Sequence, residues 1–468
     1  MSKMIRLQPT IFHVSLVIAL TAISGLFHIT ERGPVADEEF YLNFAYTLYK
    51  DNVFGKTAAP GLPAEPAANV APILPFFVSV LMRADKELAN TVECNLFSNG
   101  EKCEGSFNTI KYAELALLAI CLGIVWLLLY RMSDSLLLSY LTILIVLISG
   151  SPYFYIDHFL TESIYFPMAC IFALVFAKAL ANKEAYMLAI ASVLIGMLAL
   201  TRPTFFYLFF ILLAFSLLYI FILYRRIALS HKVTLIFSFI IPFALVVSPW
   251  LARNYYNFDR PSITLGYGDK ALSSRLAHNK MTDKEYLYGW IYWLPDFGDS
   301  LARDLFGKDA IKRFDHNNPY SFLLHERSLL LAEVQENINR SKSVSNFQGT
   351  ASPERWLINR YIIGDLYNHI KVTMLMAWRG VFVEKYFGLF GLLFLLWGLT
   401  NGLKQHVGPH FFLISLPPLI LLFFHAAISF SIPRYNILLI LPMSIAMSAA
   451  FCSLYQHLTK IRMQPSER

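Results

Sequence analysis

The chain has few charged residues for its length. Of its 468 residues, only 15% are charged, whereas 56% are hydrophobic and 15% are aromatic. An ordinary soluble domain carries roughly 25% charged residues. Several continuously apolar runs approach the roughly 20 residues that a helix needs to cross a bilayer. They do not alternate as the strands of a membrane barrel would. We therefore predict an all-α polytopic membrane protein.

The sequence also lacks the motifs of several enzyme classes. It contains no GxxxxGK[ST] loop, no GxGxxG turn and no HExxH helix, and no internal repeat or heptad pattern is visible. A nucleotide-dependent or zinc-protease function therefore has no support in the sequence. The net charge of +7 does not indicate a nucleic-acid partner, because most Lys and Arg residues flank apolar runs.

Cysteine is scarce as well, with five residues in the chain. Cys121, Cys170 and Cys452 lie in apolar runs and are expected to be unreactive core residues. Cys94 and Cys103 flank a polar stretch that is rich in turn-forming residues. We predict a disulfide between them if this stretch faces an oxidising compartment. A cysteine pair without nearby His or further Cys is poor evidence for a zinc site.

Ten apolar runs are predicted to span the membrane. They cover residues 11–29, 112–130, 135–155, 160–180, 185–200, 204–224, 233–251, 387–403, 409–432 and 436–458. If the N-terminus lies inside, every inner segment is basic, as the positive-inside rule requires. The outer segments are then 30–111 and 253–386, each with an interfacial helix, at 69–82 and 320–341. We expect a catalytic membrane module over 1–260, a second outer segment over 253–386 and C-terminal spans over 387–468.

Carboxylates gather where the first span leaves the membrane. Asp37, Glu38 and Glu39 open an aromatic stretch, 40–50, whose apolar residues recur with a helical period. One interpretation is a plain helix start, because acidic residues complement the helix dipole there. The other is an interfacial helix that presents acidic side chains to a site. On the predicted topology, Asp157 and Glu162 lie at the same outer boundary.

Four arginines break the positive-inside rule, because all lie at the predicted outer boundary. Each could extend to the interface or pair locally with a carboxylate. Several at one depth could instead hold a lipid phosphate, whose oxygens match the guanidinium fork. A nearby carboxylate could take a proton from an acceptor while arginine stabilises the departing phosphate. The four residues are Arg202, Arg253, Arg379 and Arg434.

A series of short motifs follows a recognisable order. An acidic pair and an aromatic helix come directly after the first span, and further motifs are Glu65-Pro66, Ser151-Pro152, Thr161-Glu162-Ser163, Thr201-Arg202-Pro203, Ser248-Pro249-Trp250, Arg253-Asn254 and Arg434-Tyr435. In order and spacing they resemble the GT-C superfamily of multi-spanning glycosyltransferases. Most similar is the bacterial branch related to dolichyl-phosphate-mannose protein mannosyltransferases and to aminoarabinose transferases of lipid A. The likeness covers about 260 residues and, more loosely, the C-terminal part.

This resemblance implies a function and roles for the residues. The donor would be a polyprenyl-phosphate sugar, and the acceptor a lipid, a glycan or a protein. The base would be Asp37, supported by Glu38, and the second acidic site would be Asp157 with Glu162. Phosphate-binding roles would fall on Arg202, Arg253 and Arg434. Where some relatives carry Lys-Pro-Pro in the first outer segment, this chain has Ala71-Pro72-Ile73-Leu74-Pro75, so a phosphate ligand there stays open.

The resemblance also sets expectations for cofactors and location. No cofactor is required, although the carboxylates could recruit a divalent metal, as some relatives do. The protein would be a multi-pass protein of the bacterial inner membrane with its active site on the extracytoplasmic face. Two alternatives remain open: a transporter or flippase of lipid-linked sugars, and a glycan polymerase or ligase. The first is less favoured, because the spans carry little charge and show no repeat.

Overall fold

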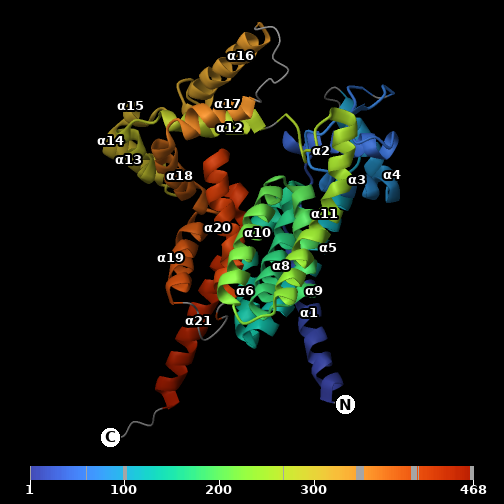
Figure 1. The fold of residues 1–468 in the computed structure, drawn as a ribbon. Coiled ribbons are helices and arrows are strands. Elements are labelled where there is room, and N and C mark those ends of the chain that lie inside the picture. Colours follow the sequence, from blue (N-terminus) through green and yellow to red (C-terminus); the bar gives the residue numbers. More distant parts are fainter. Residues whose placement is uncertain are drawn as a thin grey trace. The chain divides into compact units, whose positions relative to one another are not determined.

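The computed structural model describes residues 2–59, 61–98, 103–266, 268–343, 353–401, 408 and 410–463. Over these residues the fold is helical, and its only β structure is one pair of two-residue strands. This confirms the predicted all-α class (Figure 1). The chain forms two compact units, the first comprising Met1–Leu265, Phe394–Pro417 and Ile440–Arg468, and the second comprising Gly266–Leu393 and Pro418–Leu439.

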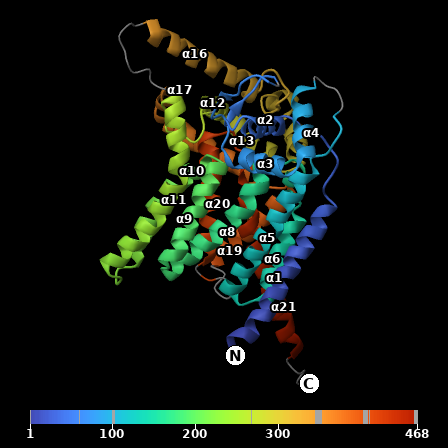
Figure 2. The same cartoon turned by 90° about the vertical axis from the view of Figure 1, so that its right-hand side faces the viewer.

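Apolar helices form the body of the first unit (Figures 1 and 2). In lipid, backbone groups must bond within their own segment, so long apolar runs become helices. The most enclosed is α8, with 83% of its apolar window buried between neighbours that include α5 and α9. The helices are α1 (Ser2–Leu26), α5 (Asn108–Ser133), α6 (Leu136–Ile148), α7 (Ser151–Asp157), α8 (Thr161–Asn182), α9 (Ala185–Thr201), α10 (Thr204–Leu223), α11 (Leu229–Phe258) and α21 (Ile440–Met463).

Each of the ten predicted spans coincides with a helix or a bent helix pair. Six described helices are long and apolar enough to cross a membrane, and two bent pairs raise that number to at most eight. In the first pair, α6 and α7 meet at 47°, where Gly150 adopts a left-handed conformation. The apolar part of α1 (Thr10–Leu26) and α9 are shorter. The protein is therefore a multi-pass membrane protein, and the ten predicted spans fall on these six helices, the two bent pairs and the two shorter helices.

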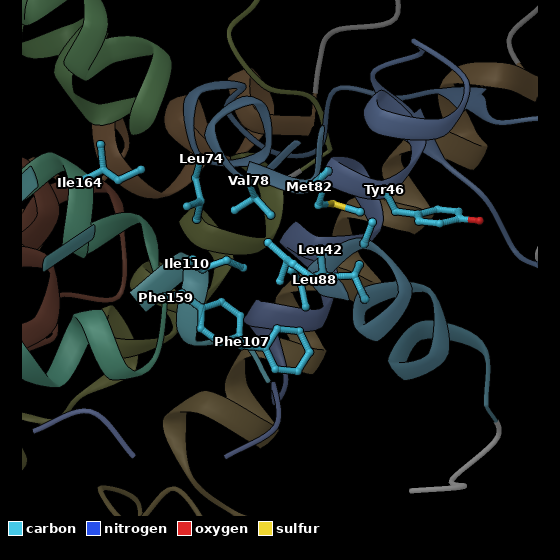
Figure 3. Close-up of a cluster of buried hydrophobic side chains, with 13 residues drawn as sticks. Leu42, Tyr46, Leu74, Val78, Met82, Leu88, Phe107, Ile110, Phe159 and Ile164 are labelled. Atoms are coloured by element: carbon cyan, nitrogen blue, oxygen red, sulfur yellow. The ribbon is translucent and has the colours of Figure 1, made fainter. Parts of the chain in front are cut away.

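The first outer segment folds onto one end of this unit, opposite to the end that carries the N-terminus (Figure 1). Its apolar side chains, such as Leu42 and Val78, belong to one buried cluster with Ile110 of α5 and Ile164 of α8 (Figure 3). The segment is therefore anchored on the membrane helices. It contains α2 (Asp37–Lys50), β1 (Gly55–Lys56), β2 (Glu65–Pro66), α3 (Ile73–Ala84) and α4 (Lys86–Phe97).

Two further contacts tie the loops of this segment to its helices. The Asn43 side chain on α2 exchanges two hydrogen bonds with the backbone of Thr57, which follows β1. At the far end of α4, Cys94 and Cys103 form the predicted disulfide, with Cα atoms 5.8 Å apart. The remaining three cysteines are free and buried, as expected.

The carboxylate that caps the N-terminus of α4 makes a contribution to stability that depends on pH. Asp85 is the N-cap, and its Oδ1 accepts hydrogen bonds from the backbone N–H groups of Glu87 and Leu88. The Thr109 hydroxyl donates to the other carboxylate oxygen at 2.5 Å. This hydroxyl, followed by the backbone donor Leu88, lowers the pKa of Asp85 below its ordinary value. The charged form is therefore the one that the fold stabilises.

We expect the Asp85→Ala variant to lose about 1 kcal/mol of stability at pH 7, as for other N-caps. Because the folded-state pKa is lowered, this contribution is present above the unfolded pKa of about 4 and disappears as the pH falls through the folded value. Unfolding of both proteins in detergent, measured from pH 7 down to about pH 3, checks this. A stability difference that stays constant with pH would contradict it.

The second unit contains the predicted second outer segment and the start of the C-terminal part. Its predicted helix at 320–341 is present, as a π-helical turn followed by α16. Its elements are α12 (Gly268–Leu276), η1 (Ala277–Lys280), α13 (Asp283–Tyr292), α14 (Gly298–Phe306), α15 (Lys308–Ile311), η2 (Phe322–Glu326), α16 (Arg327–Ser343), α17 (Pro353–Leu357), η3 (Ile358–Ile363), α18 (Leu366–Val381) and η4 (Pro433–Leu439), together with the first part of α19 (Tyr386–Asn401) and the last part of α20 (His410–Ile428), whose other parts belong to the first unit.

Arg275 holds the helices of this unit together. Its guanidinium is fully buried and donates to the backbone carbonyl of Ala426 in the last turn of α20. It also donates to the carbonyl of His369 and the hydroxyl of Thr373 on α18. Burial lowers the pKa of Arg275 to about 9. A cation at a helix C-terminus is favourable, so the arginine is matched by carbonyl dipoles and serves the fold.

Candidate functional site

Asp37 is the first residue of α2, and its side chain is exposed. Ala36, directly before it, has a φ of 51°, which is uncommon for a residue other than glycine. Such backbone strain clusters at functional sites. Glu38 points inward and is 2% exposed, and its Oε2 accepts a hydrogen bond from the backbone N–H of Val35. Glu39 is exposed. The three carboxylates therefore have different environments.

A network of charges links the start of α2 to the membrane helices. Arg32 donates two hydrogen bonds to Glu38, at 2.5 and 3.0 Å, and its Nε lies 3.6 Å from Asp157 at the end of α7. Asp157 also forms an ion pair with Lys111 on α5, in which Oδ1 lies 2.8 Å from the lysine Nζ. Its carboxylate accepts two further hydrogen bonds, from the backbone N–H and the hydroxyl of Thr30. Three segments far apart in sequence are thereby joined. The network fixes the position of the segment that precedes Asp37.

Glu162 and Arg202, both predicted site residues, form a second charge pair. Their side chains lie 2.9 Å apart, with exposed fractions of 0% and 14%. The Arg202 guanidinium also lies 5.0 Å from the ring of Tyr165, and the Thr161 hydroxyl donates to Glu162. The pair brings the N-terminal turn of α8 to the C-terminus of α9. It supplies the local carboxylate partner that was the alternative to a shared lipid phosphate.

Arg253, near the end of α11, contacts the first outer segment. It donates to the backbone carbonyls of Phe54, at 2.5 Å, and Ala67, at 3.0 Å. Its guanidinium lies within about 5.5 Å of the rings of Phe54, Trp250 and Phe258. These contacts fasten α11 to the loop after α2. The role of Arg253 in binding a donor phosphate stays a prediction.

Arg379 and Arg434 belong to the second unit. Arg379 is 9% exposed, and no carboxylate pairs with it in the described part of the chain. Its Nη2 forms a hydrogen bond with the Nε2 of His316, whereas its Nη1 is buried without a hydrogen-bond partner. The guanidinium also lies 4.0 Å from the centre of the Phe430 ring. Arg434 lies in the first turn of η4. Within the described residues, Arg379 thus keeps a buried guanidinium nitrogen without a partner and has no carboxylate to compensate its charge.

A buried histidine next to this arginine does not add charge. His278 is 2% exposed, and burial, then Arg379 and Arg275, hold its pKa well below the usual range. The ring is therefore neutral at physiological pH. The surroundings of Arg379 therefore carry positive charge that an anion could neutralise.

Three charged residues of the first unit were missed by the sequence prediction. Arg32 and Lys111 are the cations of the network, and Glu114 is fully buried one turn beyond Lys111 on α5. A signal was available for each. Arg32 and Lys111 are basic residues on the predicted outer side, and Glu114 is a carboxylate inside a predicted span, a position that is usually functional.

The predicted site residues of the first unit are Asp37, Glu38, Asp157, Glu162, Arg202 and Arg253. The site therefore combines an accessible carboxylate with buried, paired charges. Among the described residues, no group of three or more His, Cys, Asp or Glu side chains is arranged to hold a metal ion.

Comparisons with known proteins add a distant structural likeness. No protein-family model matches the sequence, and no curated protein is significantly similar to it. Among solved structures, the archaeal oligosaccharyltransferase AglB from Archaeoglobus fulgidus, in complex with an inhibitory peptide and a dolichol-phosphate, is similar, with a TM-score of 0.48 and 11% identity. The likeness covers 98% of this chain and 52% of that chain, so this chain spans about half the length of that protein. At this level the likeness assigns no function.

Proposed function

We propose that the protein is a membrane glycosyltransferase that moves a sugar from a polyprenyl phosphate to an acceptor at the outer face of the membrane, with Asp37 as general base. The observation that carries the proposal is the start of α2. There, an exposed carboxylate follows a strained residue and precedes a buried glutamate that Arg32 holds with two hydrogen bonds. Such a base must be accessible and held in place.

The proposed reaction is a single displacement with inversion. An acceptor hydroxyl, deprotonated by Asp37, attacks the anomeric carbon of the donor sugar. The bond from that carbon to the phosphate oxygen breaks, and its electron pair leaves with the polyprenyl phosphate. The proton ends on Asp37, and the leaving group needs no protonation if cationic side chains stabilise its charge.

Deleting the gene and analysing lipid-linked sugars and envelope glycans by mass spectrometry tests this function. We expect a polyprenyl-phosphate sugar to accumulate and one sugar to be missing from a glycan. The purified protein in nanodiscs should then consume that lipid and release polyprenyl phosphate only when acceptor is present. If instead the protein moves the lipid across vesicle membranes without consuming it, it is a transporter and the proposal is wrong.

Arg379 provides a test of donor binding. A hydrogen bond to a charged group contributes about 1.5–3 kcal/mol, so we expect Arg379→Gln to lower kcat/KM for the donor by roughly 10–100-fold. Stability should not fall, because the variant removes a buried charge that no carboxylate compensates. The control is Arg303→Gln, which changes an exposed arginine of α14 in the same unit. A loss of stability with unchanged kcat/KM would make Arg379 structural.

A further inference from the structure

A polar cavity of about 410 Å³ lies beside the charge network in the first unit. Three segments form its walls: the linker after α1, the face of α4, and the stretch that leads into α5. Its volume is within the roughly 300–1,000 Å³ of ordinary ligand sites. The lining residues are Thr30, Glu31, Arg32, Gly33, Glu87, Thr91, Asn95, Cys103, Gly105, Ser106, Phe107 and Asn108.

Several polar side chains of this cavity form no hydrogen bond with other described residues. Within the described part of the chain, no hydrogen bond holds the side-chain amides of Asn95 and Asn108 or the carboxylates of Glu31 and Glu87. Phe107, 5% exposed, adds an apolar surface. Amides and carboxylates beside an aromatic ring suit the alternating hydroxyl groups and C–H faces of a sugar ring.

The charges of the cavity indicate which sugars fit. Among the described lining residues the one cation is Arg32, which is already neutralised by the two hydrogen bonds to Glu38 and by Asp157 at 3.6 Å. Glu31 and Glu87 have no such partner, so the described residues of the cavity carry net negative charge. An acidic sugar or a phosphate would be repelled, whereas a neutral or amino sugar would be accepted.

The walls are fixed in place. The disulfide attaches Cys103 to α4. Gly105 has a φ of 113° and approaches Thr91 so closely that a Cβ atom would collide with its hydroxyl. Only glycine allows both this conformation and this approach. The cavity is therefore preorganised, which reduces the cost of ordering a weakly held sugar.

We infer that this cavity binds the sugar portion of the acceptor, as a neutral or amino sugar. As an acceptor site it rests on the proposed function, whereas sugar binding itself does not. Because Arg32 belongs both to the cavity wall and to the pair with Glu38, a sugar here would lie beside the segment that positions Asp37.

Saturation-transfer NMR on the full-length protein in nanodiscs tests the inference, with methyl glucoside, glucosamine and glucuronic acid as probes. We expect the first two to bind and the third not to bind. Asn95→Leu should weaken binding at least 10-fold. Asn90→Leu, an exposed position on the same helix, should not. Unfolding measurements on both variants verify that they fold, and Asp37→Asn should retain binding.

The outcomes separate the two proposals. If glucuronic acid binds as well as methyl glucoside, or if Asn95→Leu binds normally, the cavity assignment is wrong, even when transfer activity is present. If the two expected probes bind but no polyprenyl-phosphate sugar is consumed, the cavity still binds sugar and the glycosyltransferase function is wrong.

Discussion

Replacing Asp37 with Asn is expected to lower the rate of sugar transfer by roughly 10²–10⁴-fold, the usual contribution of a positioned general base. The amide keeps the shape and polarity of the side chain but does not accept a proton at neutral pH. Donor binding should change little, because Asp37 acts on the acceptor. Single-turnover measurements with labelled donor, together with a separate donor-binding assay, distinguish these effects.

Folding should be retained in this variant. Asp37 is exposed, and the buried hydrogen bonds at the start of α2 are made by its neighbour Glu38. Asp37→Asn does remove one charge that complements the helix dipole, which costs at most about 1 kcal/mol. Glu39→Gln is the matched control, because it removes an equivalent charge from an exposed residue of the same turn.

The pair of variants gives a clear decision. Loss of transfer in Asp37→Asn with normal transfer in Glu39→Gln supports Asp37 as the base. If both variants lose activity equally, the helix dipole rather than proton transfer explains the effect. Normal turnover by Asp37→Asn would remove Asp37 from the mechanism.

Elements that depend on local sequence could be predicted well. Long apolar runs become helices wherever the surroundings leave the backbone no other partner, so α5, α8 and α10 match their predicted spans closely. The helix after Asp37 follows from its apolar period, and the disulfide follows from two cysteines beside a turn. Length was less predictable, because composition does not reveal where a helix bends, as α6 and α7 do.

The pairing of charges could not be predicted, because it depends on which helices become neighbours. Arg202 pairs with Glu162, forty residues earlier in the chain, while its role at a phosphate stays a prediction. Arg253 contacts carbonyls almost 200 residues away. Neither Arg253 nor Arg379 has a carboxylate partner among the described residues, but Arg253 donates to backbone carbonyls, whereas Nη1 of Arg379 is buried without a hydrogen-bond partner. The positive-inside exceptions therefore do not all have one cause. Two serve as contacts between segments, and one retains uncompensated charge.

The partners of Asp157 could not be predicted from the sequence either. Asp157 was predicted as a second acidic site, yet its carboxylate is held by Lys111, Thr30 and Arg32. Such an aspartate is constrained as a base, because protonation would break these contacts. Its contribution to the fold is therefore expected to be large.

Replacing Lys111 with Met is expected to destabilise the protein by about 3 kcal/mol, the lower end of the cost of breaking a buried ion pair. The Lys111 side chain is 1% exposed, and its Nζ contacts Asp157 at 2.8 Å and the Thr30 carbonyl at 2.6 Å. Met fills the same volume but leaves the Asp157 carboxylate buried, with Arg32 at 3.6 Å as its remaining cation. Unfolding in mixed micelles measures the loss.

Two comparisons identify the cause of that loss. Lys312→Met removes the cation of an exposed pair, at 3.8 Å from Asp309, and should change stability little. The double variant Lys111→Met with Asp157→Asn should be more stable than the sum of the two single changes predicts, because the carboxylate left unpaired by the first change is then neutral. If the effects simply add, the pair is not coupled. Transfer activity should fall with Lys111→Met as well, because Lys111 would no longer hold the Thr30 carbonyl and the Asp157 carboxylate, which together position the segment before the start of α2.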